Sequence, residues 1–138
     1  MPKSKSLDKK TARLLDANLN RACEGLRVIE DIGRYIWNDQ NIFKKARSLR
    51  HRLHVITASH YTSLVLSRDS EQDMGRRVKE KARSSVGAVL AANLRRAEEA
   101  ARVLEEFSKV FSPQAAAALK RVRYELYTLE KAVIRKEK

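Results

Sequence analysis

The feature that most constrains this chain is an internal repeat. Residues 16–31 align with residues 91–106 at an offset of 75, and nine of the sixteen aligned positions are identical. The stretches that follow match more weakly, with residues 48–54 aligned to residues 121–127. The chain is therefore expected to use one structural unit twice, and each unit must bury its apolar face against the other.

Apolar residues recur with a helical period in four stretches. These cover about 7–37, 42–62, 84–111 and the segment from Ser112–Pro113 onward. Ser84 or Ser85 is the predicted N-cap of the third helix, and Ser112 followed by proline begins the fourth. We expect a single all-α domain with pseudo-twofold symmetry: hairpin 1 at about 7–62, a loop at about 63–83 and hairpin 2 at about 84–136.

Composition excludes several classes of protein. Only 4 glycines and 2 prolines occur in 138 residues, which argues against a turn-rich all-β fold. A single cysteine, Cys23, forms neither an internal disulfide nor a cysteine zinc cluster, so a reducing compartment is expected. The lysine-rich start has no apolar region, and no apolar run has membrane length. We therefore expect a cytoplasmic protein.

The net charge of +13 predicts anionic partners without identifying them. Nucleic acid, acidic lipid, phosphorylated metabolites and acidic proteins all stay open at this point. The glycine-rich phosphate-binding motifs of nucleotide-binding folds and the serine hydrolase motif are absent from the sequence. These classes of protein are therefore set aside.

Two polar strips interrupt the apolar sectors of the first and third predicted helices. Their members are Asn18, Arg21 and Gly25 in the first helix and Asn93, Arg96 and Ala100 in the third. Burying arginine or asparagine is costly unless the side chain is paired or hydrogen-bonded. Three interpretations are open: a ligand cleft between the hairpins, a polar layer satisfied by ion pairs, or arginines whose stems cover the edge of the core.

The segment from Ser67 to Arg83 is the longest stretch without a helical stripe. Long loops in compact domains are commonly functional or disordered. Asp69 and Asp73 in this loop are candidate oxygen ligands for Mg²⁺, although two aspartates alone are weak evidence for a metal. A plain linker is the other interpretation.

Several motifs together resemble a known family. They are the first repeat from Asp16 to Asp31, the loop Arg68-Asp-Ser-Glu-Gln-Asp-Met-Gly75, the third-helix stretch from Ala92 to Glu106, and Arg123-Tyr124. This set is similar to the small helical hydroxymethylpyrimidine phosphate kinase domain often fused ahead of thiamin phosphate synthase. Met74 stands where that family usually has valine. No synthase barrel follows in this sequence, so the resemblance is to a stand-alone form.

The resemblance implies an enzyme that uses ATP and Mg²⁺ to phosphorylate hydroxymethylpyrimidine phosphate to the diphosphate. Such phosphoryl transfer depends mainly on alignment and charge neutralisation, which arginines and Mg²⁺ supply. The expected catalytic residues are Arg21, Arg68 and Arg96; substrate and phosphate would bind Asn18, Arg50, Asn93 and Arg123; and Mg²⁺ would bind Asp69 and Asp73.

Two functions of other classes stay open. A basic helical module could dock on thiamin phosphate synthase and carry no chemistry, or it could bind RNA with a strong dependence on salt. Glutamates interrupt the basic surface, which argues against nucleic acid, and no membrane partner is expected. Two similar halves in one chain are compatible with a monomer, but the sequence leaves the oligomeric state open.

Overall fold

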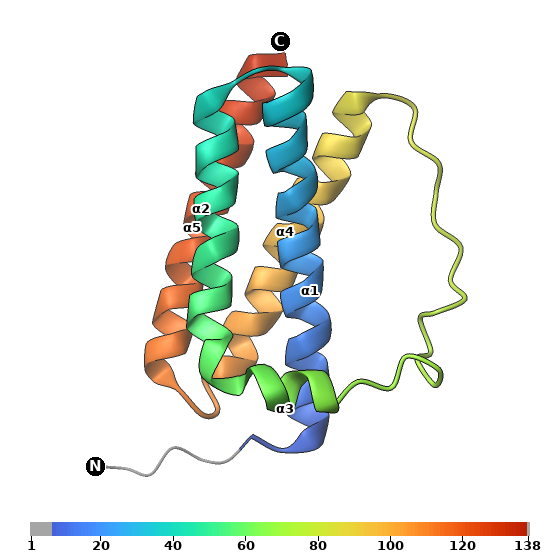
Figure 1. The fold of residues 1–138 in the computed structure, drawn as a ribbon, viewed down its shortest axis with the longest axis vertical. Coiled ribbons are helices and arrows are strands. Elements are labelled where there is room, and N and C mark those ends of the chain that lie inside the picture. The colour runs from blue at the N-terminus through green and yellow to red at the C-terminus, as the bar shows by residue number, and fades with distance from the viewer. Residues whose placement is uncertain (1–6, 138) are drawn as a thin grey trace.

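The computed structural model describes residues 7–137, and its four long helices form a bundle (Figure 1). In chain order the first long helix runs up, the next two run down and the last runs up. The α-helices are α1 (Lys9–Asp31), α2 (Gln40–Thr57), α3 (Tyr61–Leu66), α4 (Val86–Ser108) and α5 (Pro113–Glu137). α1 packs against α2 and α4, and α5 packs against α4 and α2. The short α3 lies across the lower end of the bundle, against α1. The predicted all-α, bundle-like fold is confirmed.

A capping side chain starts each long helix. Asp8 accepts from the backbone N–H of Thr11 at 2.9 Å, and Asp39 accepts from that of Ile42 at 3.0 Å. Ser85 caps α4, and Ser112 caps α5 immediately before Pro113. Such caps satisfy helix N–H groups that lack an intrahelical partner, at about 1 kcal/mol each. The predicted starts at Ser85 and at Ser112–Pro113 are confirmed.

Two predicted boundaries differ from the structure. α1 ends at Asp31 and continues as a π-helical turn, Ile32–Ile36, before Asn38 takes a positive φ of 48°. The second helix ends at Thr57 instead of residue 62, and a 3₁₀ turn, Ala58–His60, leads into α3. Residues 63–66, which were expected to belong to the loop, are therefore helical. Leu64 explains this extra helix because its side chain is 2% exposed and joins the core.

The contact between α1 and α4 brings two backbones close together. A Cβ atom added to Gly25 would lie 2.8 Å from the backbone oxygen of Asn93 and 3.5 Å from the Cβ of Ala97. Gly25 therefore lets the helices touch, and it does not open space for a ligand. The predicted cleft is wrong at this point of the helix pair.

The asparagines of the two strips are satisfied within their own helices. Asn18 donates from Nδ2 to the Leu14 carbonyl at 2.9 Å, and Asn93 donates to the Val89 carbonyl at 2.8 Å. Bonds to the carbonyl four residues earlier are a local way to bury a short polar side chain. Arg21 and Arg96 are exposed.

Each helix pair carries a buried glutamate held by two arginines. Glu30 of α1 is paired with Arg27 at 3.5 Å and with Arg50 of α2 at 3.0 Å. Its counterpart Glu105 of α4 is paired with Arg102 at 3.1 Å and with Arg123 of α5 at 3.1 Å. A buried carboxylate is tolerable only when it is paired in this way. The repeated sequence therefore produces the same ion-pair cluster twice, whereas the overall twofold symmetry stays a prediction.

No helix within residues 7–137 is long and apolar enough to cross a bilayer.

Replacing Gly25 by alanine tests the close helix contact. The added methyl group meets backbone that cannot rotate away, so we expect a loss of about 1–3 kcal/mol in the free energy of unfolding. Urea denaturation followed by circular dichroism measures it. Gly87→Ala is the matched control, because there the added methyl meets only the flexible end of the Glu137 side chain. That variant should be neutral or slightly stabilised, and equal effects of the two substitutions would contradict the contact.

A pair of glutamates between α4 and α5 makes stability depend on pH. Burial raises the pKa of Glu98 to about 7 from 4.5, and the Glu130 carboxylate of α5 adds to this shift, whereas Arg95 opposes it. The unfolded chain releases this proton at lower pH than the folded chain. The part of the free energy of unfolding that comes from protonated Glu98 is therefore fully present below about pH 4.5. It is lost as the pH rises through 7, because the carboxylate then ionises inside the folded protein.

Glu98→Gln should consequently raise the urea midpoint at pH 8 and leave it nearly unchanged at pH 4. Glu99→Gln, which removes an exposed charge from the next position, controls for net charge and should show no such difference. A Glu98→Gln effect of the same size at both pH values would contradict the pKa shift.

Candidate functional site

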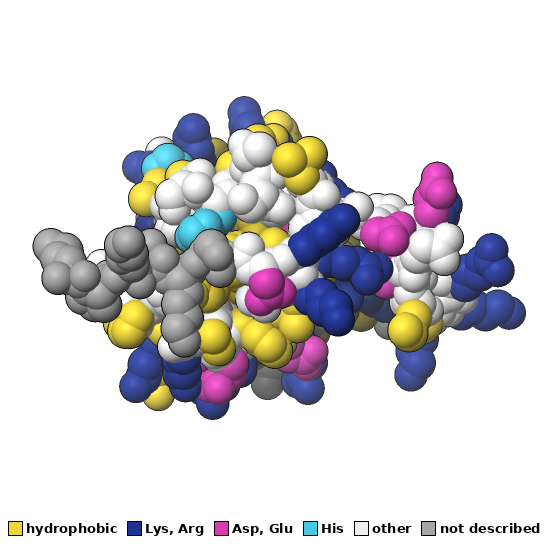
Figure 2. Space-filling view, turned by 90° about the horizontal axis from the view of Figure 1, so that it is seen from below, with side chains coloured by type: hydrophobic (Ala, Val, Ile, Leu, Met, Phe, Trp, Pro, Cys, Tyr) yellow, Lys and Arg dark blue, Asp and Glu magenta, His cyan; other side chains and the backbone are white. Residues whose placement is uncertain are grey.

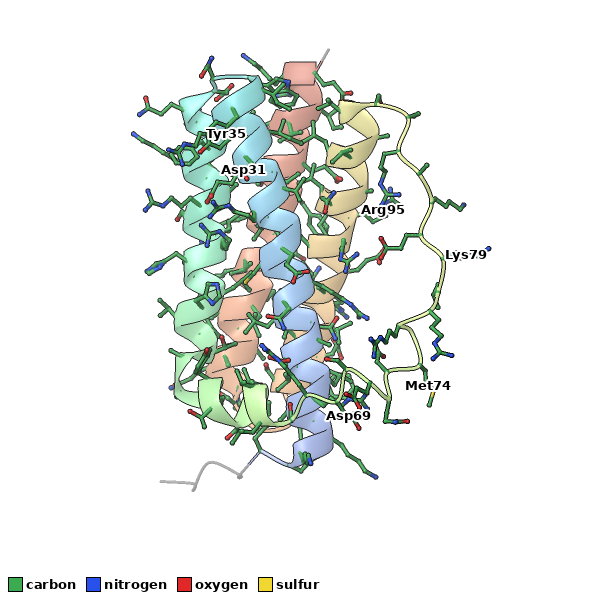
Figure 3. The ribbon with its side chains drawn as sticks, turned by 45° about the vertical axis from the view of Figure 1, so that its right-hand side comes forward. Asp31, Tyr35, Asp69, Met74, Lys79 and Arg95 are labelled. Atoms are coloured by element: carbon green, nitrogen blue, oxygen red, sulfur yellow. The ribbon has the colours of Figure 1, made fainter. Side chains whose placement is uncertain are left out.

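A hollow of about 690 Å³ lies beside the first half of α1. One wall is the face of α1 from Lys10 to Arg21, and the other is the start of the loop, residues 68–74. Five of the nine predicted site residues line it: Asn18, Arg21, Arg68, Asp69 and Asp73. Figure 3 shows Asp69 at the foot of the loop beside α1, with Met74 further out. The hollow therefore unites the first polar strip with the loop motif.

An ion pair between Asp16 and Arg68 holds the loop against α1. Arg68 donates from Nε to Asp16 Oδ2 at 2.7 Å and from Nη2 to Oδ1 at 3.1 Å. The Asp16 carboxylate is 5% exposed and raises the pKa of Arg68 through these bonds, so the guanidinium keeps its charge. Paired bonds of this kind fix orientation as well as distance.

Sequence reasoning missed Asp16 as a site residue, although it begins the repeat. The signal that could have identified it is its counterpart in the second copy, which is Ala91. A carboxylate present in only one copy is not required by the shared scaffold. Asp16 therefore distinguishes the first repeat, whose helix α1 binds the start of the loop through Arg68, from the second repeat.

The loop carboxylates are ordered by the loop's own backbone. Asp69 Oδ1 accepts from the N–H of Gln72 at 3.3 Å, and Asp73 Oδ1 accepts from the N–H of Gly75 at 3.2 Å. Arg13 donates to the Asp69 carbonyl at 3.2 Å, which ties the loop to α1 a second time. Each carboxylate uses one oxygen in these turns, so the other oxygen can face the hollow.

These carboxylates fit Mg²⁺ bound together with a substrate, and not a cage made by protein alone. Mg²⁺ commonly takes one or two carboxylates, substrate phosphates and waters. Asp69 and Asp73 provide two carboxylates in one hollow. Across residues 7–137, no group of three or more His, Cys, Asp and Glu side chains is placed to hold a metal. The phosphate groups of a bound substrate would have to complete the coordination shell of Mg²⁺.

Cationic side chains make the hollow suitable for phosphate. Lys10, Arg13, Arg21 and Arg68 line it, and one of its three aspartates, Asp16, is already paired. Seen from below, Lys and Arg side chains gather between the bundle and the loop, with Asp and Glu beside them (Figure 2). Asn18 Oδ1 accepts from Arg21 Nη1 at 3.5 Å, which steadies an otherwise exposed guanidinium.

The other four predicted residues are not brought to this hollow. Asn93 is used within α4, and Arg96 is exposed on α4 outside the lining. Arg50 and Arg123 each bind a buried glutamate, in separate clusters on the α1–α2 and α4–α5 pairs. The four-helix arrangement therefore places only Arg21 and Arg68 of the five predicted arginines at this hollow, and the roles of all five stay predictions.

Asp16→Asn tests whether this ion pair orders the loop. The neutral amide cannot form two charge-assisted bonds with Arg68, so residues 68–76 should gain motion. Their backbone ¹⁵N order parameters should fall from about 0.85 to below about 0.6. Asp31→Asn removes a half-buried carboxylate from the other end of α1 and should leave the loop unchanged. Unaltered order parameters in Asp16→Asn would exclude Asp16 as the anchor.

The chain resembles known proteins over most of its length. A thiamine-phosphate synthase of Nostoc punctiforme is 44% identical over 121 residues, which cover 86% of this chain and 34% of that protein. One of Synechococcus sp. strain CC9605 is 42% identical over 132 residues, covering 94% and 37%. One of Rhodopirellula baltica is 38% identical over 119 residues, covering 83% and 32%. The chain thus spans about a third of the length of these relatives.

No solved structure matches the chain significantly. The family match extends over residues 13–132 and so includes both halves of the repeat, the loop and every lining residue of the hollow except Lys10. The family match and these relatives confirm that the chain resembles one part of thiamin phosphate synthases. The chain belongs to the ThiD2 family.

Proposed function

We propose that this chain acts in thiamin biosynthesis by transferring a phosphoryl group from ATP to hydroxymethylpyrimidine phosphate. The observation that carries the proposal is the hollow itself, where Arg21, Arg68, Asp69 and Asp73 come together. Cations to hold phosphates beside carboxylates to hold Mg²⁺ are the parts that phosphoryl transfer requires. The relatives named thiamine-phosphate synthase support the choice of pathway.

The acceptor explains why the site needs no strong general base. A phosphate monoester is largely dianionic at neutral pH, since its second pKa is about 6. Its oxygen is already a competent nucleophile, and the obstacle is repulsion between two anions. Arg21 would neutralise one phosphate, and the Nη1 group of Arg68 would donate to a phosphate while Nε and Nη2 stay on Asp16.

Asp69 and Asp73 would hold Mg²⁺, which when bound supplies charge neutralisation on the donor phosphates. The backbone turns that engage one oxygen of each carboxylate fix where the metal-binding oxygens lie. The Asp16–Arg68 pair then has a positioning role, because it sets the distance between the loop carboxylates and Arg21.

The test is a coupled assay for ADP release with ATP, Mg²⁺ and hydroxymethylpyrimidine phosphate. Arg21→Ala, Asp69→Asn and Asp73→Asn should each lower kcat/KM by about 10²–10³, the usual effect of removing one electrostatic stabiliser. Arg96→Ala is the matched control, because it alters the counterpart of Arg21 in the second repeat, outside the hollow. It should keep most of the activity.

Two outcomes would contradict the proposal. Equal losses in Arg21→Ala and Arg96→Ala would move the site away from the hollow. Folded protein that releases no ADP but binds thiamin phosphate synthase would instead establish a non-catalytic module of that enzyme.

A further inference from the structure

A second hollow, of about 600 Å³, lies between α4 and α5 and shares no lining residue with the first. Its lining includes the small side chains of Pro113, Ala116 and Ala117. Two lysines also line it: Lys109, which directly follows α4, and Lys120 of α5. Its lining includes Lys109 and Pro113 beside the connection between the two helices, and Figure 1 shows this connection at the lower end of the bundle.

The inner wall of this hollow is a fixed ionic cluster. Arg123 donates from Nε and Nη2 to the two oxygens of Glu105, each at 3.2 Å, and from Nη1 to the hydroxyl of Tyr127 at 3.4 Å. Arg102 is the second cation on Glu105. Glu105 is 2% exposed and already carries two arginines, and Lys109 is paired with Glu106 at 2.7 Å. Within the described residues 7–137, Lys120 forms no salt bridge, so it is the lysine of the hollow that is available to an anionic ligand.

Tyr124 adds an aromatic surface to these cations. The guanidinium carbon of Arg123 lies 5.0 Å from the centre of its ring, and Lys120 Nζ lies 5.9 Å away. The side chain is nevertheless 54% exposed, so much of the ring is open to solvent. An open ring between cations suits a ligand that combines a planar ring with negative charge.

The first repeat shows that the ionic cluster does not need this ring. Arg50 and Glu30 form the equivalent pair there, yet His51 occupies the position that corresponds to Tyr124. His54 likewise corresponds to Tyr127. The cluster therefore forms with or without tyrosine at this position. The exposed Tyr124 ring consequently has no part in the scaffold that the two halves share.

We propose that the α4–α5 hollow binds a planar aromatic phosphate ester of the nucleoside monophosphate class. The ring would stack on the open part of Tyr124, and the phosphate would bind Lys120, with Lys109 able to join it only by leaving Glu106. This site is separate from the hollow beside α1 and does not depend on the transfer reaction proposed there.

Calorimetric titration with AMP, without Mg²⁺ and at low salt, tests the site. Adenosine and inorganic phosphate serve as probes of the ring alone and of the charge alone, and both should bind more weakly than AMP. Tyr124→Ala should weaken AMP binding about tenfold while leaving phosphate binding unchanged. Lys120→Ala should weaken both AMP and phosphate.

His51→Ala is the matched control from the first repeat and should bind AMP like the unaltered chain. Arg96→Ala, which alters an exposed arginine of α4 that lines neither hollow, should also bind AMP normally. The proposal would be overturned if Tyr124→Ala kept the AMP affinity of the unaltered chain. It would also be overturned if the unaltered chain bound no AMP, or if Arg96→Ala lost AMP binding. Because Tyr124 is mostly exposed, its variant should unfold at the same temperature, which a thermal melt checks.

Discussion

The close contact of α1 with α4 is the constraint on which the rest of the structure depends. Gly25 packs directly against the backbone of Asn93, and Ala97 completes the contact. Small residues are needed here because any larger side chain would force the two helices apart. This contact joins the two hairpins along their length. It also turns the exposed face of α1 that carries Arg21 toward the loop and away from the partner helix.

The buried carboxylates of this scaffold are each paired with arginine. Glu30 and Glu105 are almost completely buried, and each is balanced by one arginine of its own helix and one arginine of a neighbouring helix. These pairs occur in both repeats, so they belong to the common framework. Asp16 is the exception, since its partner comes from the loop and its counterpart is Ala91. One carboxylate thus converts a repeated scaffold into an asymmetric molecule with a loop fixed on one side.

The same asymmetry gives the two hollows different chemistry. The hollow beside α1 combines arginines with loop carboxylates and suits phosphates bound together with Mg²⁺. The hollow between α4 and α5 combines lysines with an open tyrosine ring. A duplicated helical hairpin can therefore develop distinct ligand surfaces, provided that the residues on its buried side stay unchanged.

The sequence by itself determined the local features of this protein. The helical period and the caps at Ser85 and Ser112 predicted the helices, because each depends on residues a few positions apart. The repeat of residues 16–31 predicted that one helical unit occurs twice, because it is visible by aligning the sequence with itself. The loop motif also led to the prediction of Arg68, Asp69 and Asp73 as site residues. Only the tertiary structure decided that Asp16 anchors Arg68, 52 residues away, and that Gly25 brings helices together instead of opening a cleft. Helical periodicity shows which face of a helix is polar, but not which distant backbone or side chain meets that face, because that depends on how the four helices pack.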